Sequence, residues 1–203
     1  MALQIGGRVE SDFTQPLGMM RDCHRRVEHF LEQLLAVARE DRGGPMDAGR
    51  RAAFDTALRY FRTGAPLHTA DEEESLFPRL RGSTSGAAAR ALAGMERLEH
   101  EHRHAQGVHA EVDAMGTRWL ETGELSAAEA DRLVDLLAGL RETYRAHIAY
   151  EDEELFPLAA AALDEIQLSQ IGREMALRRG LDPDRLPSIS RCASRRLQRT
   201  TGA

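Results

Sequence analysis

Two stretches of the chain repeat one pattern of residues that commonly bind metal ions. HTADEEESLFP (68–78) and HIAYEDEELFP (147–157) share the spacing H-x-A-x-E-[ED]-E-x-L-F-P. On an α-helix, residues four apart are neighbours about 5–6 Å apart on one face, so each copy would place a histidine beside a glutamate. Burying such groups without partners costs on the order of several kcal/mol, and a bound cation offsets that cost. The repeat therefore predicts four metal ligands: His68, Glu72, His147 and Glu151.

Two further histidines complete the predicted site. Apolar residues recur at three- or four-residue spacing on four predicted helices, and such residues share the face that a bundle turns toward its core. Each of these apolar faces is interrupted by a histidine near one level, and His24 and His102 are the interruptions on the first and third helices. Four imidazoles and two carboxylates that can bridge suit a pair of borderline metal ions. We expect iron, with manganese or zinc as alternatives.

The elements that must position these residues are helices, because no period-2 strand pattern stands out. Pro16 is typical of a first helical turn, and Ser126 with Glu129 forms a capping box. Gly64 and Pro66 predict a kink shortly before His68, which would orient that histidine or open a path for a diatomic ligand. The predicted helices span residues 16 to about 40, 47 to about 80, 87 to about 122, 126 to about 163 with a bend at Pro157, and 169–179.

These helices predict an all-α fold, an up-down-up-down four-helix bundle with a short extra C-terminal helix and a basic tail. The expected division is an N-terminal extension (1–14), the bundle (15–163), the short helix (164–182) and a disordered basic tail (183–203). Residues 185–203 contain five arginines and no acidic residue, a composition typical of a solvated tail.

The composition excludes several chemistries. All 27 basic residues are arginine, so lysine Schiff bases and the P-loop lysine are ruled out. Cys23 and Cys192 are too few for a disulfide framework or a thiolate cluster. The net charge of −6 argues against a nucleic-acid partner. We find no secretory signal and no apolar run long enough to span a membrane, and we therefore expect a cytoplasmic protein without a membrane partner.

The doubled H-x-x-x-E…LFP motif resembles that of the hemerythrin-like, or HHE cation-binding, family over roughly residues 15–163. This resemblance implies a four-helix bundle around a non-haem di-iron centre, two iron ions bridged by the two glutamates. Matched position by position, the family's ligands would be His24, His68, Glu72, His102, His147 and Glu151.

The chain departs from the oxygen-carrying hemerythrins at two positions. Gln106 stands where those proteins have a second third-helix histidine, and their last carboxylate would correspond to Asp152. The internal repeat favours Glu151 instead. Having fewer histidines argues against simple oxygen carriage and fits the broader bacterial members, which are associated with oxygen or nitric oxide sensing, iron handling and stress repair.

Several residues near the predicted ligands could assist them. Glu28 lies one turn after His24, and a solvated role is expected for it. His109 is about 10 Å along the helix from His102, which suits packing or support of a ligand. Tyr144 is expected either to pack in the core or to donate a hydrogen bond toward an open metal position. The roles of Glu101, Gln106 and Asp152 stay open. Two glutamate pairs are expected to be solvated or to bind ligand imidazoles: Glu73-Glu74 and Glu153-Glu154.

One local pattern imitates a different site. His100-Glu101-His102-Arg103-His104 satisfies the zinc-protease pattern H-E-x-x-H. At 100° per residue, however, His100 and His104 each lie about 160° from His102, away from the core. We interpret them as exposed histidines. Glu99 and His102 form one E-x-x-H, whereas ferritin-like di-iron proteins require two on separate helices.

The sequence therefore predicts a di-iron protein that binds oxygen, nitric oxide or peroxide for sensing or stress response. One alternative is an oxidoreductase that reduces peroxide or nitric oxide at the same site, with electrons from an unknown redox partner. Another is iron storage, or iron donation for cluster repair.

Overall fold

The computed structural model describes residues 10–185, and within this range the protein consists of helices and connecting loops without strands. In chain order the elements are α1 (Pro16–Asp41), α2 (Ala48–Thr63), α3 (Ala65–Ala70), the π-helix η1 (Asp71–Leu76), α4 (Phe77–Gly82), α5 (Gly86–Thr122), α6 (Ala127–Tyr150), the π-helix η2 (Glu151–Leu155), α7 (Phe156–Ala162), α8 (Glu165–Arg178) and the 3₁₀ turn η3 (Pro183–Arg185).

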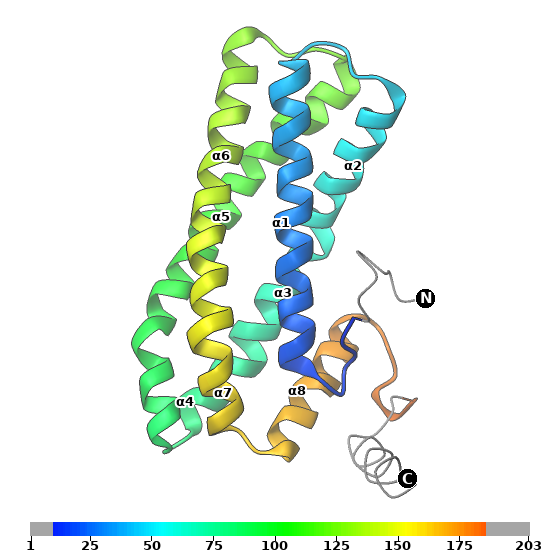
Figure 1. The fold of residues 1–203 in the computed structure, drawn as a ribbon. Helices are drawn as coiled ribbons and strands as arrows, with labels where there is room; N and C mark the ends of the chain where they lie inside the picture. Colours follow the sequence, from blue (N-terminus) through cyan, green and yellow to red (C-terminus); the bar gives the residue numbers. More distant parts are fainter. Residues whose placement is uncertain (1–9, 186–203) are drawn as a thin grey trace, which may run out of the picture.

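The long helices lie side by side along one axis (Figure 1). Helix α1 packs against α2 and α6, and α5 packs against α2, α6 and α7. Helix α8 lies across one end, where it contacts α1 and η1. The all-helical fold is confirmed, and the arrangement is consistent with a four-helix bundle.

The bundle has two apolar clusters rather than one. The first surrounds Phe54 and Trp119, whose rings make an edge-to-face contact. The second surrounds Phe77 and Phe156, both of which are fully buried. The predicted metal ligands are not members of either cluster; they include the buried polar residues His24, His68, Glu72, His147 and Glu151. The apolar packing therefore holds the helices on two sides of one polar level.

Local sequence signals explain where the helices begin and end. Pro16 occupies the first turn of α1, and the Ser126–Glu129 capping box opens α6. Gly123, with φ of +82°, ends α5. Helix α8 begins at Glu165, four residues before the expected start, because Asp164 forms a second capping box with Gln167.

The prediction of a single helix from residue 47 to about 80 is wrong in one respect. The structure divides this segment into α2, α3, η1 and α4. The first break falls at Gly64, as the sequence predicted. A Cβ atom there would lie 2.7 Å from the Tyr60 ring, and Pro66 stands in the first turn of α3. The fourth helix is divided in the same way into α6, η2 and α7.

The two π-helices occupy equivalent places in the repeat, and periodicity did not predict them. In η1 the Phe77 N–H donates to the carbonyl of Glu72, five residues back, and in η2 Phe156 donates to Glu151. A proline follows each phenylalanine. Since proline has no N–H and crowds the carbonyl four residues before it, the LFP ending of each copy favours a widened turn there. Single π turns are frequent at functional sites.

Most of the expected basic tail and most of the expected N-terminal extension lie outside the described residues. The first three residues of the expected tail form η3. Among residues 10–185, no helix is long and apolar enough to cross a membrane.

Candidate metal centre

The structure brings all six predicted ligands together. They form two groups of four residues, and within each group one ligand atom per residue lies within 4.8 Å of the others. The groups are His24, His68, Glu72 and Glu151, and Glu72, His102, His147 and Glu151. Both glutamates belong to both groups, which is the arrangement required of two metal positions sharing two carboxylates.

The distances show how the carboxylates are shared. Glu72 has Oε1 3.4 Å from His68 Nε2 and Oε2 3.4 Å from His102 Nε2. Glu151 Oε2 lies 3.0 Å from His24 Nε2 and 3.2 Å from His147 Nε2. Each glutamate thus contacts imidazoles of both groups, and Glu72 Oε1 also lies 3.8 Å from His24 Nε2. Four helical columns contribute, through α1, α3 with η1, α5, and α6 with η2.

The chemistry of these atoms fits a metal ion. Glu72 and Glu151 are 0% exposed, and neither carboxylate has a hydrogen-bond partner among the described residues. The same is true of His24 Nε2, whose contacts with Glu72 and Glu151 lack hydrogen-bond geometry. Several unsatisfied buried polar atoms in one place would be costly without a ligand. A cation bound to neutral imidazoles and ionised carboxylates would satisfy them.

Three of the four imidazoles are held from behind by a carboxylate. His24 Nδ1 donates to Asp152 at 3.0 Å, and His102 Nδ1 donates to Glu73 at 2.8 Å. His147 Nδ1 donates to Glu101 at 2.8 Å. In the neutral imidazole this contact fixes the tautomer whose unprotonated Nε2 faces the cluster.

Two of these orienting carboxylates follow the repeat. Asp152 and Glu73 each come directly after a shared glutamate, so the E-[ED] dipeptide supplies one carboxylate to the cluster and one to an imidazole on another helix. Glu73 was expected either to be solvated or to bind an imidazole, and it binds His102. The roles of Asp152 and Glu101 had been left open. The structure places Glu151, not Asp152, among the converging atoms. Glu153 and Glu154 are exposed, and Glu74 pairs with Arg178.

The phenylalanine of each LFP ending packs against one imidazole of the cluster. Phe156 stacks on the ring of His24 at 5.4 Å between centroids, with an interplanar angle of 10°. Phe77 lies parallel to His102 at 6.4 Å. Each copy of the repeat therefore supplies a ring that restrains an imidazole from a different helix.

Burial and mutual charge separate the pKa values of the two glutamates. Burial, reinforced by the negative charge of Glu151, raises the pKa of the Glu72 carboxyl. Burial also opposes ionisation of Glu151, but the imidazoles of His147 and His24 outweigh it and lower its pKa. The two buried carboxyls therefore differ in how readily they ionise, and Glu151 is the more readily ionised of the two.

The imidazoles differ in the same way. Burial opposes protonation of His147, yet the Glu151 carboxylate outweighs it and raises the pKa of His147 to about 9. His24 also has a pKa well above its ordinary value, because Asp152 and Glu151 outweigh burial. His68 has no orienting carboxylate, and burial together with the charge on His24 lowers its pKa. Metal binding would displace the protons that His24 and His147 carry.

The remaining candidates lie outside the two groups. Glu28 and Gln106 are exposed, as are His100 and His104, so the zinc-protease pattern forms no site. His109 Nε2 and Tyr144 Oη are hydrogen-bonded at 2.9 Å.

Comparisons with known proteins agree with this site. The family described as the hemerythrin HHE cation-binding domain matches residues 15–159. An uncharacterized protein of Haemophilus influenzae is 27% identical over 167 residues, which cover 82% of this chain and 91% of that protein.

Proposed function

The chain belongs to the hemerythrin HHE cation-binding family, and from that premise we propose that its six-residue cluster holds two iron ions. The observation that carries the proposal is the membership of Glu72 and Glu151 in both ligand groups. One ion would be held by His24 and His68, and the other by His102 and His147. Both ions would share Glu72 and Glu151.

We propose that the centre binds oxygen, nitric oxide or peroxide for sensing or stress response. A non-haem di-iron pair supplies reversible ligand binding or electron transfer when it is present. The chain's own residues orient the imidazoles through Asp152, Glu73 and Glu101, and the phenylalanine rings exclude water from one side. A cavity of about 20 Å³ beside the cluster has room for a ligand about the size of one water molecule. Gln106, exposed at the position of a further family ligand, supplies no imidazole.

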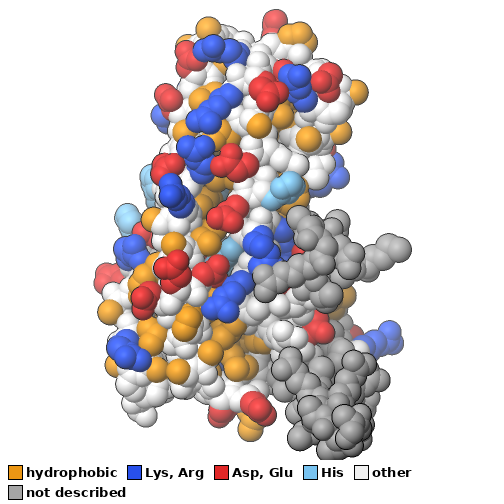
Figure 2. Space-filling view, viewed as in Figure 1, with side chains coloured by type: hydrophobic (Ala, Val, Ile, Leu, Met, Phe, Trp, Pro, Cys, Tyr) orange, Lys and Arg blue, Asp and Glu red, His pale blue; other side chains and the backbone are white. Residues whose placement is uncertain are grey.

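The remaining parts of the proposal concern topology and surroundings. We propose that the four helical columns alternate in direction, since the connections after α1, α4 and α5 are short. We propose that the protein is cytoplasmic and has no nucleic-acid or membrane partner. We also propose that an unknown redox partner supplies its electrons. Charged side chains of both signs are interspersed on the face in Figure 2, whereas nucleic-acid sites are typically basic stripes.

Anaerobic loading of the full chain with ferrous iron, followed by exposure to oxygen, tests the function. We expect two irons per chain and new charge-transfer absorption. Glu72→Gln should lose iron, and the matched variant Glu28→Gln, at an exposed glutamate, should not. The proposal would be contradicted if the chain bound zinc and, after loading with iron, showed no change in its absorption spectrum on exposure to oxygen or nitric oxide. Turnover of peroxide with an electron donor would establish the oxidoreductase alternative, and rapid transfer of iron to an apo-acceptor would establish iron donation.

A further inference from the structure

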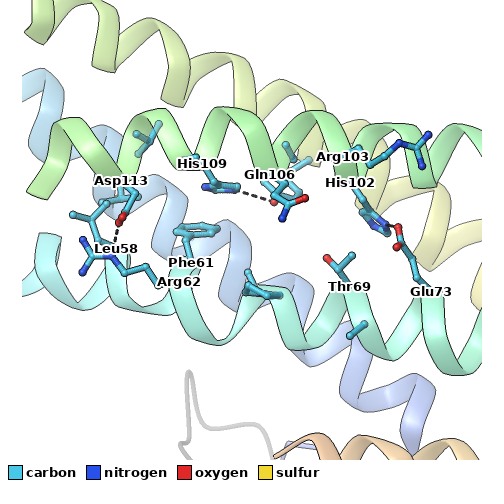
Figure 3. A pocket seen from close by; sticks show the side chains of 18 of the residues that line it. Leu58, Phe61, Arg62, Thr69, Glu73, His102, Arg103, Gln106, His109 and Asp113 are labelled. Carbon is cyan, nitrogen blue, oxygen red and sulfur yellow. Dashed lines mark hydrogen bonds and ion pairs between the residues drawn. The ribbon is translucent and has the colours of Figure 1, made fainter.

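A groove of about 450 Å³ lies beside the cluster, between α5 on one side and α2 and α3 on the other (Figure 3). This volume is within the range of small-molecule sites and far exceeds that of a diatomic ligand. The Arg62–Asp113 ion pair lies at one end of the groove, and the His102–Glu73 pair lies at the other.

The lining of the groove is mainly apolar. Its floor is formed by core side chains, including Leu58, Phe61 and Val112. Alanines at positions 65, 70 and 110 line its walls, and small side chains at these places leave the space open. The helix break at Gly64 separates α2 from α3 along the same wall.

The groove meets the small cavity beside the metal ligands. Ala65, Thr69, His102 and Tyr144 line both spaces, and the small cavity also borders His24, His68 and His147. The hydroxyl-bearing side chains that line both spaces are therefore Thr69 and Tyr144, and the Tyr144 hydroxyl is hydrogen-bonded to His109. A molecule in the groove could direct one hydrogen-bonding end group toward the cluster between them.

The charges along the groove favour an uncharged occupant. Arg62 pairs with Asp113 and Glu74 with Arg178, and Glu73 accepts a hydrogen bond from His102. Arg103, the other charged side chain of the lining, is exposed and extends away from the groove (Figure 3). The carboxylates at the inner end, Glu73 and Glu74, already have partners, so neither is free to bind a cationic end group. His109, which also lines the groove, is kept neutral because burial lowers its pKa to about 4.

We propose that this groove binds an uncharged organic molecule with an apolar body and one hydroxyl or hydroperoxide end group, placed beside Thr69 and Tyr144. The inference rests on the proposed function only in that the end group then lies next to the metal ions. The groove itself is formed by the chain without them.

Cumyl alcohol is a suitable redox-inert probe, titrated into the full chain loaded with Zn²⁺ and into the metal-free chain by calorimetry. We expect saturable binding of one molecule per chain. Ala110→Trp should fill the groove and weaken binding by at least about tenfold. Ala89→Trp, at an exposed alanine on the same helix away from the groove, should change it by less than about twofold. Cumene, which lacks the hydroxyl, should bind about fivefold more weakly, and Thr69→Val should reduce that difference.

Absence of saturable binding to the wild-type chain, equal weakening by both tryptophan variants, or equal affinity for cumene and cumyl alcohol would overturn the proposal. The zinc content of the same samples separates this result from the metal proposal. A chain that binds cumyl alcohol but no metal supports the groove and contradicts the proposed function. A chain that binds two zinc ions but no alcohol contradicts the groove and leaves the two metal positions intact.

Discussion

The Nε2 atoms of His102 and His147 lie 3.1 Å apart although the two residues are on different helices. Two imidazoles that bind one ion at about 2.1 Å each, at right angles, have their nitrogens about 3 Å apart. Each ring is fixed by a carboxylate behind it, Glu73 for His102 and Glu101 for His147. The chain therefore positions this pair for a metal ion through contacts that need no metal.

This arrangement predicts a large effect of Glu101 on metal affinity. Glu101→Gln replaces the acceptor that fixes the His147 tautomer, and loss of such a partner typically costs about 10- to 100-fold in metal affinity. Competition with a chelator measures it. The control is Glu96→Gln, an exposed glutamate on the same helix. Equal affinities of the two variants would show that Glu101 does not position His147.

Helix α8 should contribute to stability through Asp71. That carboxylate, directly before Glu72, is 0% exposed and pairs with Arg178 at 3.0 Å and Arg179 at 2.6 Å. Arg179→Met leaves a buried charge with one partner, and breaking a buried pair costs about 3–5 kcal/mol when no second partner exists. We expect a loss of about 2 kcal/mol in the free energy of unfolding.

Urea denaturation measures this loss. The matched control is Arg173→Met on the same helix, whose ion pair with Asp184 is exposed, and such pairs contribute about 0–1 kcal/mol. If both variants lost the same free energy of unfolding, the pairing of Asp71 with Arg179 would not stabilise the protein as proposed.

The helical fold and the six residues that converge on the cluster could be predicted from sequence, and the contacts that support them could not. The repeat identifies His68, Glu72, His147 and Glu151 because helical spacing alone places each pair on one face. Glu101 could not be assigned, because its contact with His147 depends on how α5 and α6 are rotated against each other. The π-helices were missed because a widened turn leaves the apolar spacing nearly unchanged. The expected division of the chain at residues 14, 163 and 182 stays a prediction.

Two glycines should respond oppositely to alanine. A Cβ at Gly172 on α8 would collide with the backbone carbonyl of Phe13, and overpacking typically costs about 1–3 kcal/mol. Gly107 on α5 has open space around its Cβ position, so Gly107→Ala should stabilise the helix by about 0.5–1 kcal/mol. Thermal unfolding of both variants measures the two effects, and a stabilising Gly172→Ala would contradict the docking of α8 on the segment before α1.

The half-buried His109 predicts a specific pH dependence. Burial lowers its pKa from 6.5 to about 4, so between these pH values the unfolded chain binds a proton there and the folded chain does not. The contribution of this residue to stability is therefore full above pH 6.5 and declines as the pH falls to about 4, by up to about 3 kcal/mol. His109→Phe removes the titration. As the pH falls from 6.5 to about 4, the wild type should lose unfolding free energy relative to the variant. A difference between the two that stays constant over this range would exclude a neutral His109 in the folded chain.

The central claim is that two iron ions share Glu72 and Glu151. Mössbauer spectroscopy of the full chain, loaded anaerobically with ⁵⁷Fe and then oxidised, tests it most directly, because carboxylate-bridged ferric ions couple magnetically. We predict two irons per chain forming a coupled, diamagnetic pair. A single iron per chain, or two irons that behave as isolated paramagnetic ions, would contradict the account.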